Sequence, residues 1–474
     1  IKYKYHIVMK TFATTTLLLL TTAFCLSCNS EEDEYIYPEH LPDISHRVLA
    51  GGETTIYSEN SFAYSAAAEN LNEEENNLHD EGDQMFDVTF VAHPAPVYGG
   101  LGPIYNSTSC ISCHPGEGRA PFPTDLVRAR GFLMRVSLPG VDAHGGPLSV
   151  PGFGTQVQNL ATAGFRPEGQ FAVSYTDIVE TFKDGTEVVL KKPNYILTGI
   201  TASVPADILI SPRTSMPIYG LGLLEFIPEA DLLAAEDIED RNKDGISGKV
   251  NRVWDEANQR IAIGRFGWKA NTASLLDEAA GSFSGDLGVT NPYHGYRVEI
   301  GHGQVGSDDG RDDEPEISQH DVDATTFYLQ TLAVPAARNL NKPSVRNGSR
   351  IFEGIGCAAC HTPKQRTLQA PVRALANQTF YPYTDMLLHD MGDNLADGRP
   401  DFLATGREWR TRPLWGIGLQ ELVSGHTHFM HDGRAKNITE AILWHGGEAL
   451  RSKEIFKKLT KKERADLLEF LNSI

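Results

Sequence analysis

The stretch GIGCAACHTP, residues 354–363, places two cysteines two residues apart and a histidine directly after the second: Cys357, Cys360 and His361. The stretch STSCISCHPG, residues 107–116, repeats this pattern with Cys110, Cys113 and His114. The order C-x-x-C-H is typical of covalent haem c attachment, because two thiols add across the haem vinyl groups and the adjacent histidine ligates the iron. The repeated motif therefore predicts two covalent haems, with His114 and His361 as iron ligands.

A zinc site built from the four motif cysteines is the structural alternative. Such a site would leave both histidines without a role, and its halves would have to meet across 247 residues (357 − 110). The chain has six cysteines, and the other two, Cys25 and Cys28, lie in an apolar N-terminal segment. No cysteine is therefore left for a structural disulfide in the mature protein.

The N-terminal segment has the features of an export signal. Met9 begins MKTFATTTLLLLTTAFCLSC, in which a short basic start precedes an apolar run too short to span a bilayer. Ser27 before Cys28 suits a cleavage that leaves Cys28 as a lipidated first residue, so residues 1–28 are predicted to be a signal peptide. An acidic stretch follows, and residues 29–85 are predicted to be a tether and an N-terminal edge. We expect a lipoprotein of the cell envelope, anchored in the outer membrane and facing the periplasm or the cell surface.

The composition is that of a soluble globular protein with an acidic surface. Of the 474 residues, 41% are hydrophobic and 22% are charged, and the formal net charge is −20. A phosphate backbone would repel this charge, which argues against nucleic-acid binding. The length leaves room for more than one domain with its own core.

The predicted fold is mainly α, with two haem domains. An aromatic residue lies five positions before the first cysteine of each motif, Tyr105 and Phe352. This arrangement resembles the opening helix of class I cytochrome c domains. We therefore expect two class I cytochrome c-like domains, the first over residues 86–330 with a small β-containing insertion, and the second over residues 331–474.

Two local patterns add detail to this fold. Asp184-Gly185 lies between the strand-like runs ETFK and TEVVL, and this order predicts a β-hairpin inside the insertion. Residues 452–474 have an amphipathic pattern, with Leu467, Leu468, Phe470 and Leu471 on the packing side. This pattern predicts one C-terminal helix.

The loop DRNKDGISGKVN, residues 240–251, has the spacing of a calcium site. Asp240, Asn242 and Asp244 occupy loop positions one, three and five, and Gly245 supplies the sharp turn at position six. Asn251 stands where a bidentate glutamate usually closes such a loop. A metal-free turn rich in Asx residues is the alternative.

Several longer motifs resemble one family. They are GLGPIYNSTSCISCH, GLGLLEFIPE, GRFGWKANTASLLDEAAGSFSGDLG, TDMLLHDMG, EWRTRPLWGIG and HDGRAKNITEAILWHGGEA. Together they resemble the dihaem oxidoreductases often labelled thiol oxidoreductases or peroxidases, which are related to the bacterial dihaem cytochrome c peroxidases. The resemblance extends from about residue 50 to the end of the chain.

The resemblance implies roles for individual residues. In the peroxidases, a methionine fourteen residues after the histidine of an H-D-G motif ligates the C-terminal haem. Here His431 opens the motif and His445 stands at that place, so the second haem is expected to be ligated by two histidines. Trp268 corresponds to the tryptophan between the haems, and Glu278 and Asp286 correspond to distal-pocket groups of the first haem. Glu278 replaces an amide of the peroxidases.

Other histidines and methionines are assigned lesser roles. No residue stands out as the sixth ligand of the first haem, and His144 and Met216 are weak candidates. His426 and His428 lie near His431, and a separate copper or zinc site is the alternative to loop histidines near the haem edge. His389 in LHDMG is expected to contact the pocket or a propionate.

The expected function is that of an exported, lipid-anchored dihaem c-type oxidoreductase. Electrons would pass from the C-terminal haem to a peroxidase-like N-terminal haem that reduces peroxide or a related oxidant. Expected partners are a small electron-donor protein or a quinol-linked cytochrome, a small-molecule oxidant, and the membrane. The alternatives are oxidation of a protein or thiol substrate, a pure electron-transfer cytochrome, and a partner in iron or haem acquisition.

Overall fold

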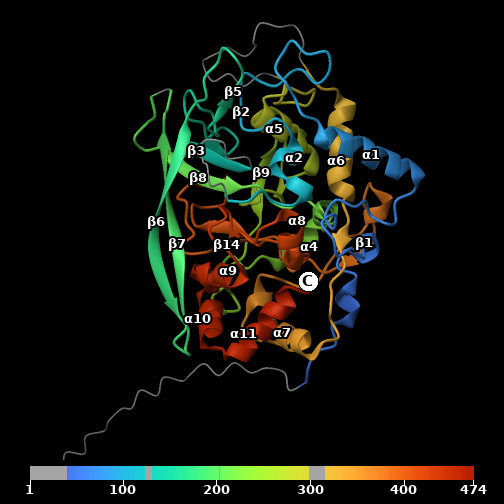
Figure 1. The fold of residues 1–474 in the computed structure, drawn as a ribbon, viewed down its shortest axis with the longest axis vertical. Helices are drawn as coiled ribbons and strands as arrows, with labels where there is room; N and C mark the ends of the chain where they lie inside the picture. Colours follow the sequence, from blue (N-terminus) through green and yellow to red (C-terminus); the bar gives the residue numbers. More distant parts are fainter. Residues whose placement is uncertain (1–39, 123–130, 202, 298–314) are drawn as a thin grey trace, which may run out of the picture. The chain divides into compact units, whose positions relative to one another are not determined.

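The computed structural model describes residues 40–122, 131–201, 203–297 and 315–474 (Figure 1). The predicted signal peptide and its Cys28 lie outside the described residues. The helices are α1 (Glu73–Asp87), α2 (Cys110–Cys113), α3 (Leu221–Glu225), α4 (Glu229–Ala235), α5 (Leu275–Leu287), α6 (Gln319–Thr331), α7 (Pro343–Gly354), α8 (Gln420–Ser424), α9 (Ile438–Trp444), α10 (Leu450–Lys458) and α11 (Lys461–Leu471).

The strands form one three-stranded sheet, ordered β4-β3-β8, and six two-stranded pairs. This count covers the described residues. The strands are β1 (Thr55–Ile56), β2 (Ile104–Tyr105), β3 (Phe132–Val141), β4 (Pro147–Leu148), β5 (Leu160–Ala161), β6 (Gln170–Thr181), β7 (Glu187–Thr198), β8 (Leu209–Thr214), β9 (Asn251–Asp255), β10 (Arg260–Gly264), β11 (Val334–Pro335), β12 (Gln365–Arg366), β13 (Thr379–Phe380), β14 (Leu388–Asp390) and β15 (Glu408–Arg410).

The prediction of a mainly α fold with two cytochrome c-like domains is wrong. The chain is about 30% helix and 20% strand, and the strands are spread over many small sheets. The physical reason is that most strands pair over two or three residues between distant segments. Such short pairings leave no alternating pattern long enough to identify in the sequence.

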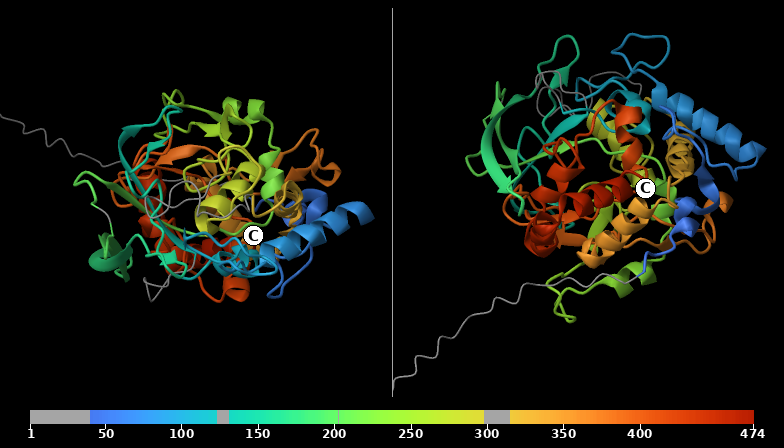
Figure 2. Two further views of the ribbon diagram at one scale, coloured as in Figure 1. Left: turned by 90° about the horizontal axis from the view of Figure 1, so that it is seen from above. Right: turned by 60° about the horizontal axis from the view of Figure 1, so that its bottom comes forward.

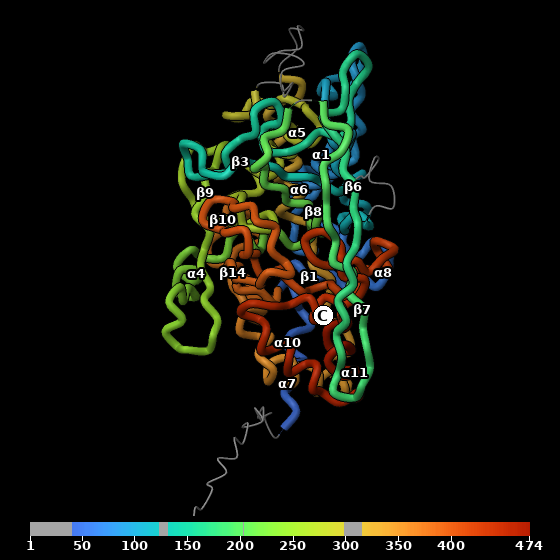
Figure 3. The backbone as a smooth tube through the Cα atoms, turned by 90° about the vertical axis from the view of Figure 1, so that its left-hand side faces the viewer, coloured from blue at the N-terminus to red at the C-terminus, as the bar shows by residue number. Residues whose placement is uncertain are grey.

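The predicted hairpin at Asp184-Gly185 is confirmed, and it is much longer than a local turn. Strands β6 and β7 have twelve residues each and pair antiparallel along their whole length. Figures 1 and 3 show the hairpin running beside the C-terminal helices. At its tip the Lys183 N–H donates to the Lys457 carbonyl oxygen at 2.9 Å, and Arg464 pairs with Asp184 at 2.6 Å. The insertion therefore contacts helices α10 and α11.

Two pairs of helices pack closely, and each pair joins segments that are far apart in the sequence. Helix α1 packs against α6, and α7 packs against α11. At Gly348 of α7, a Cβ atom would lie 2.0 Å from the Asp466 carbonyl oxygen, so only glycine permits this approach. Figure 2 shows α1 and the β6–β7 hairpin on opposite sides of the C-terminal segment.

The C-terminal helix predicted over residues 452–474 is two helices, α10 and α11. Thr460 interrupts it, because its side chain accepts from the Glu463 N–H while the Glu463 carboxylate accepts from the Thr460 N–H. This capping box begins α11 and ends the earlier helix. Leu467, Phe470 and Leu471 are buried as predicted, whereas Leu468 is only partly buried.

The described residues form one compact unit. One core cluster joins residues from both halves of the chain, among them Tyr64, Leu223, Phe380 and Trp415. The boundaries predicted at residues 86 and 331 are not tested by this packing and stay predictions. Within the described ranges, no helix has both the length and the apolar character needed to cross a membrane.

Candidate functional site

The second C-x-x-C-H motif follows helix α7. Gly356 separates the two in a left-handed conformation, with φ at 91°, and Cys357 and Cys360 are free thiols in a short turn. The His361 Nδ1–H donates to the Tyr383 carbonyl oxygen at 3.0 Å. Burial, together with the charge of a nearby histidine, lowers the pKa of His361 to about 4. His361 is therefore neutral at pH 7.

His445 lies directly after helix α9, and the structure places it beside this motif. Its Nδ1–H donates to the Ala441 carbonyl oxygen at 2.7 Å, and burial lowers its pKa. One cavity is lined by His445 together with Cys357, Cys360 and His361. His445 is also the histidine whose charge lowers the pKa of His361. The two histidines expected to ligate the second haem thus face a common cavity.

The first C-x-x-C-H motif is held by residues at the end of β8. Cys110 and Cys113 bound the short helix α2, and the Ser215 hydroxyl donates to the Cys113 carbonyl oxygen at 2.5 Å. The His114 Nδ1–H donates to the Met216 carbonyl oxygen at 2.8 Å, and burial lowers the pKa of His114. Met216, a weak candidate for a sixth ligand, therefore orients His114 through its backbone.

The three histidines share one hydrogen-bond pattern. Each Nδ1 faces a backbone carbonyl, which can only accept, so Nδ1 carries the proton in His114, His361 and His445. Each Nε2 then keeps the lone pair that binds a metal. Around the second motif the cavity is lined by apolar side chains: Phe352, Ile438, Ile442, Leu467 and Leu471. These donors and this lining fit a haem attached at Cys357 and Cys360.

Trp268 has contacts on the side of each motif. Its ring lines the cavity of the second motif, and its Nε1–H donates to the Thr214 carbonyl oxygen at 2.8 Å. Thr214 is followed by Ser215 and Met216, the two residues that hold the first motif. Three consecutive residues therefore connect the Trp268 indole to His114.

Glu278 and Asp286 both lie on helix α5, near the first motif. The Asp286 carbonyl oxygen accepts from the Asn106 N–H at 2.8 Å, just before the motif begins. The negative charge of Asp286 acts on Cys110 and His114, because it raises the pKa of both. Burial raises the pKa of Glu278, and the charge of Asp286 adds to this rise. The structure thus brings together the two acids that the sequence assigned to one pocket.

Gln156 is a polar residue of this region that the sequence analysis missed. Its side-chain amide donates to Asp286 Oδ1 at 2.7 Å and to Asn106 Oδ1 at 2.6 Å. Gln156 pairs with Arg135 of β3 through a β-bridge, and the charge of Arg135 acts on Glu278. The insertion therefore supplies an amide and a cation to the acids of α5. No motif surrounds Gln156, so the sequence offered no signal for this role.

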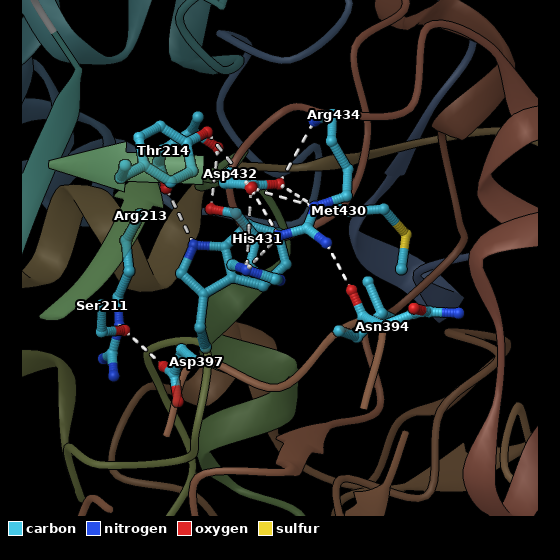
Figure 4. A network of polar contacts seen from close by, with 12 residues as sticks. Ser211, Arg213, Thr214, Asn394, Asp397, Met430, His431, Asp432 and Arg434 are labelled. Carbon is cyan, nitrogen blue, oxygen red and sulfur yellow. Dashed lines mark hydrogen bonds and ion pairs between the residues drawn. The ribbon is translucent and has the colours of Figure 1, made fainter. Parts of the chain in front are cut away.

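The H-D-G motif lies in a network of polar contacts (Figure 4), and its His431 lines the cavity. His431 stacks on Trp409 with ring centroids 3.9 Å apart, and its ring lies edge-on to Trp268 at 6.4 Å. Asp432 is fully buried and pairs with Arg434 at 2.7 Å, and the two side chains point toward each other in Figure 4. Burial lowers the pKa of His431 to about 3. The motif therefore places a neutral, stacked histidine beside Trp268.

His389 is held by two carboxylates beside the second motif. Its Nε2 lies 2.9 Å from Asp385 Oδ2, and its Nδ1 lies 2.7 Å from Glu448 Oε2. Burial opposes the charge, but hydrogen bonds with Asp385, Cys360 and Glu448 raise the pKa of His389 to about 12. Cys360, Asp385 and His389 could also hold a metal ion, since their ligand atoms lie within 4.8 Å of one another. His389 lines the cavity, as expected for a pocket residue.

The other predicted ligands lie away from both motifs or in loops. The His426 Nε2–H donates to the Arg119 carbonyl oxygen at 2.9 Å, and His144 stacks on Trp254 at the surface. In the loop predicted to bind calcium, the Asp240 carboxylate accepts from the Gly245 N–H at 3.2 Å. The Asn242 side-chain amide donates to Asp244 Oδ2 at 3.0 Å. These bonds form an Asx-rich turn, and calcium binding there stays a prediction.

Comparison with known proteins identifies the family. The family model described as "Di-haem oxidoreductase, putative peroxidase" matches residues 44–474, which include both motifs. No curated protein matches the chain. The match confirms the resemblance from about residue 50 to the end, and it assigns haem as the cofactor. The chain belongs to the di-haem oxidoreductase family.

Proposed function

We propose that the protein is an exported di-haem enzyme that reduces peroxide or a related oxidant in the pocket of its first motif. Electrons would enter at the second motif and reach the first by way of Trp268. The observation that carries this proposal is the pair of acids, Glu278 and Asp286, beside the first C-x-x-C-H motif. Trp268 connects this motif to the cavity of the second motif. An electron-transfer cytochrome without a substrate needs no such acids.

The acids give the pocket a means of moving a proton. A haem attached at Cys110 and Cys113 would supply a redox-active iron that binds the oxidant. Peroxide cleavage requires a proton to move from one oxygen to the other while charge develops. Glu278, whose pKa is raised by burial, holds a proton more readily than a free glutamate and can take up and return that proton. Gln156 fixes the orientation of Asp286, and Arg135 offsets part of the negative charge.

Replacing Glu278 with glutamine tests this role directly. We expect kcat/KM for hydrogen peroxide to fall by roughly 10²- to 10⁴-fold, the usual contribution of a positioned acid–base group. Burial and Asp286 raise the pKa of Glu278, so its carboxylate is lost at a higher pH than for a free glutamate. Wild-type activity should therefore rise with pH through this raised pKa, and the variant should lack that limb. Steady-state peroxidase assays from pH 4 to 9, in the pH range where the fold persists, measure both effects.

Asp277→Asn is the matched control, because Asp277 is a buried acid of the same helix. Its carboxylate contacts the Ala257 N–H and the Tyr296 hydroxyl rather than the first motif. It should keep the wild-type rate and pH limb. Wild-type activity in Glu278→Gln would contradict the proposed role. If cyanide fails to bind either haem in the wild type, the protein is an electron-transfer cytochrome instead.

We also propose that the haems are attached covalently and that the protein is a lipoprotein of the cell envelope. A small electron-donor protein or a quinol-linked cytochrome would deliver electrons, and the loop at Asp240, Asn242 and Asp244 would bind calcium. The C-x-x-C-H spacing supports covalent attachment, and the apolar segment before Cys28 supports export. The loop spacing supports calcium.

Replacing Cys28 with serine should release the protein from the membrane fraction, because the lipidated thiol would be lost. The acyl chains of a lipoprotein contribute about 0.8 kcal/mol per buried CH₂, so their loss removes nearly all membrane affinity. Fractionation of cells followed by detection of the protein measures the change. Cys25→Ser serves as the control and should leave the protein bound. Retention of Cys28→Ser in the membrane would show that the anchor lies elsewhere.

A further inference from the structure

Two buried arginines and one partly buried arginine lie around Trp268 in the cavity of the second motif. Arg119, Arg410 and Arg412 all line this cavity. The guanidinium carbons of Arg119 and Arg412 lie 5.5 Å and 5.1 Å from the Trp268 ring centroid, and Arg410 donates its backbone N–H to the Trp268 carbonyl oxygen at 2.9 Å. Arg119 is 4% exposed and Arg410 is 3% exposed, so these charges are shielded from water.

The side-chain partners of Arg119 are all neutral. One terminal nitrogen donates to the Met430 carbonyl oxygen at 2.7 Å and also contacts the Thr214 hydroxyl. The Arg119 Nε is buried and has no partner. Arg119 therefore has an unused hydrogen-bond donor at this cavity. A buried donor without an acceptor costs free energy, which an added acceptor would recover.

The partners of the other two arginines are also neutral, and two of them are weak acceptors. Arg410 donates to the Gly267 carbonyl oxygen at 3.1 Å and to the Met386 sulfur at 3.4 Å. Arg412 donates to the Met216 sulfur at 2.6 Å. A thioether is a poor substitute for a carboxylate, because it carries no charge.

Several other arginines with little exposed side-chain surface have carboxylate partners, whereas the buried Arg265 donates to the Leu224 carbonyl oxygen at 3.1 Å. Arg213 pairs with Asp401, Arg399 pairs with Asp401 at 2.9 Å, and Arg434 pairs with Asp432 at 2.7 Å. Across the described ranges, Arg119, Arg410 and Arg412 form no ion pair with any carboxylate. The charge of Asp432 acts on Arg119, and the charges of Glu278 and Asp385 act on Arg410, but none of these carboxylates is in direct contact. Three like charges that are only partly compensated are unfavourable in a shielded cavity.

The three guanidinium groups also oppose one another. Burial lowers the pKa of Arg119 and of Arg410 to about 9, and in both cases the charge of Arg412 adds to the effect. Burial lowers the pKa of Arg412 to about 10. A negatively charged ligand placed among them would remove this repulsion and fill the open donor position at Arg119.

We propose that Arg119, Arg410 and Arg412 form a binding site for carboxylate groups at the end of the cavity beside Trp268. The cavity is continuous from these arginines to Cys357 and His361. A haem joined to the cysteines through its vinyl edge carries its two propionates on the opposite edge, and a small free carboxylate is the other source of this chemistry. The inference rests on the proposed haem at Cys357, and it concerns residues that the proposed catalysis does not use.

The test measures how readily the second haem is reduced. The haem content of the wild type, Arg410→Gln and Arg412→Gln is determined first. A lack of covalent haem in the wild type would contradict the proposed function and not this site. At a fixed ambient potential, the ratio of reduced to oxidised haem should fall roughly tenfold in each variant, since one nearby positive charge is lost. In the wild type this ratio should not change from pH 5 to 8, because the arginines keep the carboxylates ionised. In the variants it should rise as the pH falls, since the carboxylates then become protonated.

The control and a second titration identify the source of the carboxylate. Arg265→Gln removes a buried arginine that does not line the cavity, and it should leave both the ratio and its pH dependence unchanged. Wild-type protein is then titrated with acetate against chloride at equal ionic strength. No response to acetate, together with the pH dependence in the variants, assigns the site to the haem propionates. A saturable response to acetate that the variants lose assigns the site to a free carboxylate. If the wild type does not respond to acetate and the variants show no pH dependence, the proposal is overturned.

Discussion

Replacing Cys357 and Cys360 together with alanine should reduce covalently attached haem from two per chain to one. Each cysteine forms one thioether bond, and a histidine ligand alone does not hold a haem through denaturation. Both thiols are free in the cavity that also contains His361 and His445. A pyridine haemochrome assay on purified protein gives the haem content, and haem staining after denaturing electrophoresis shows whether the remaining haem is covalent.

The reciprocal variant, with alanine at Cys110 and Cys113, is the matched control. It should also retain one haem, but that haem should keep the low-spin spectrum expected for two histidine ligands. A content of one haem in the wild type would contradict covalent attachment at both motifs. Stoichiometric zinc in place of haem would favour the four-cysteine alternative.

Replacing His445 with glycine should open the second haem to cyanide. His361 and His445 line one cavity, each with Nδ1 bound to a carbonyl and Nε2 free to ligate. A ligand that is bound for more than 99% of the time lowers the apparent affinity for a competitor by on the order of 100-fold, so its removal should raise cyanide affinity by at least that factor. Optical titration with cyanide measures the change, and added imidazole should reverse it.

His426→Gly is the control, because His426 contacts the Arg119 backbone and does not line the cavity. Its second haem should stay closed to cyanide. His445→Met should create the near-infrared band of histidine–methionine ligation and raise the reduction potential, since a thioether stabilises ferric iron less than imidazole does. If His445→Gly stays low-spin and closed, another residue ligates the haem.

Short-range motifs in the sequence predicted the di-haem family correctly, and covalent haem attachment stays a prediction. The C-x-x-C-H motifs need only five consecutive residues, and the structure sets their histidines in matching hydrogen bonds to carbonyls. The hairpin turn at Asp184-Gly185 is likewise local, and it is confirmed. The fourteen-residue step from His431 to His445 includes all of helix α9. His445 therefore lies directly after this helix, where it lines the cavity.

Long-range contacts were beyond the reach of the same reasoning. Gln156 reaches Asp286 across 130 residues, and the arginines around Trp268 come from segments almost 300 residues apart. An isolated arginine in a sequence gives no sign that it will be buried without a carboxylate. The missed break in the C-terminal helix is different, because Thr460-x-x-Glu463 is a local capping signal. The amphipathic pattern of hydrophobic residues continues through this capping signal, so the pattern alone predicted one unbroken helix.

The β6–β7 hairpin has a consequence for the order in which the chain can assemble. The hairpin is complete once residue 198 has been made, but the residues that its tip contacts, Lys457 and Arg464, lie 259 and 266 residues further along the chain (457 − 198 and 464 − 198). Until then the hairpin has no partner at its tip, and an isolated hairpin is only marginally stable in water. The tip of the insertion is therefore unsupported until the C-terminal helices have been made. If the two halves of the chain were expressed separately, the hairpin would lose the helices that support its tip. The two halves therefore depend on each other to fold and are not two independent modules.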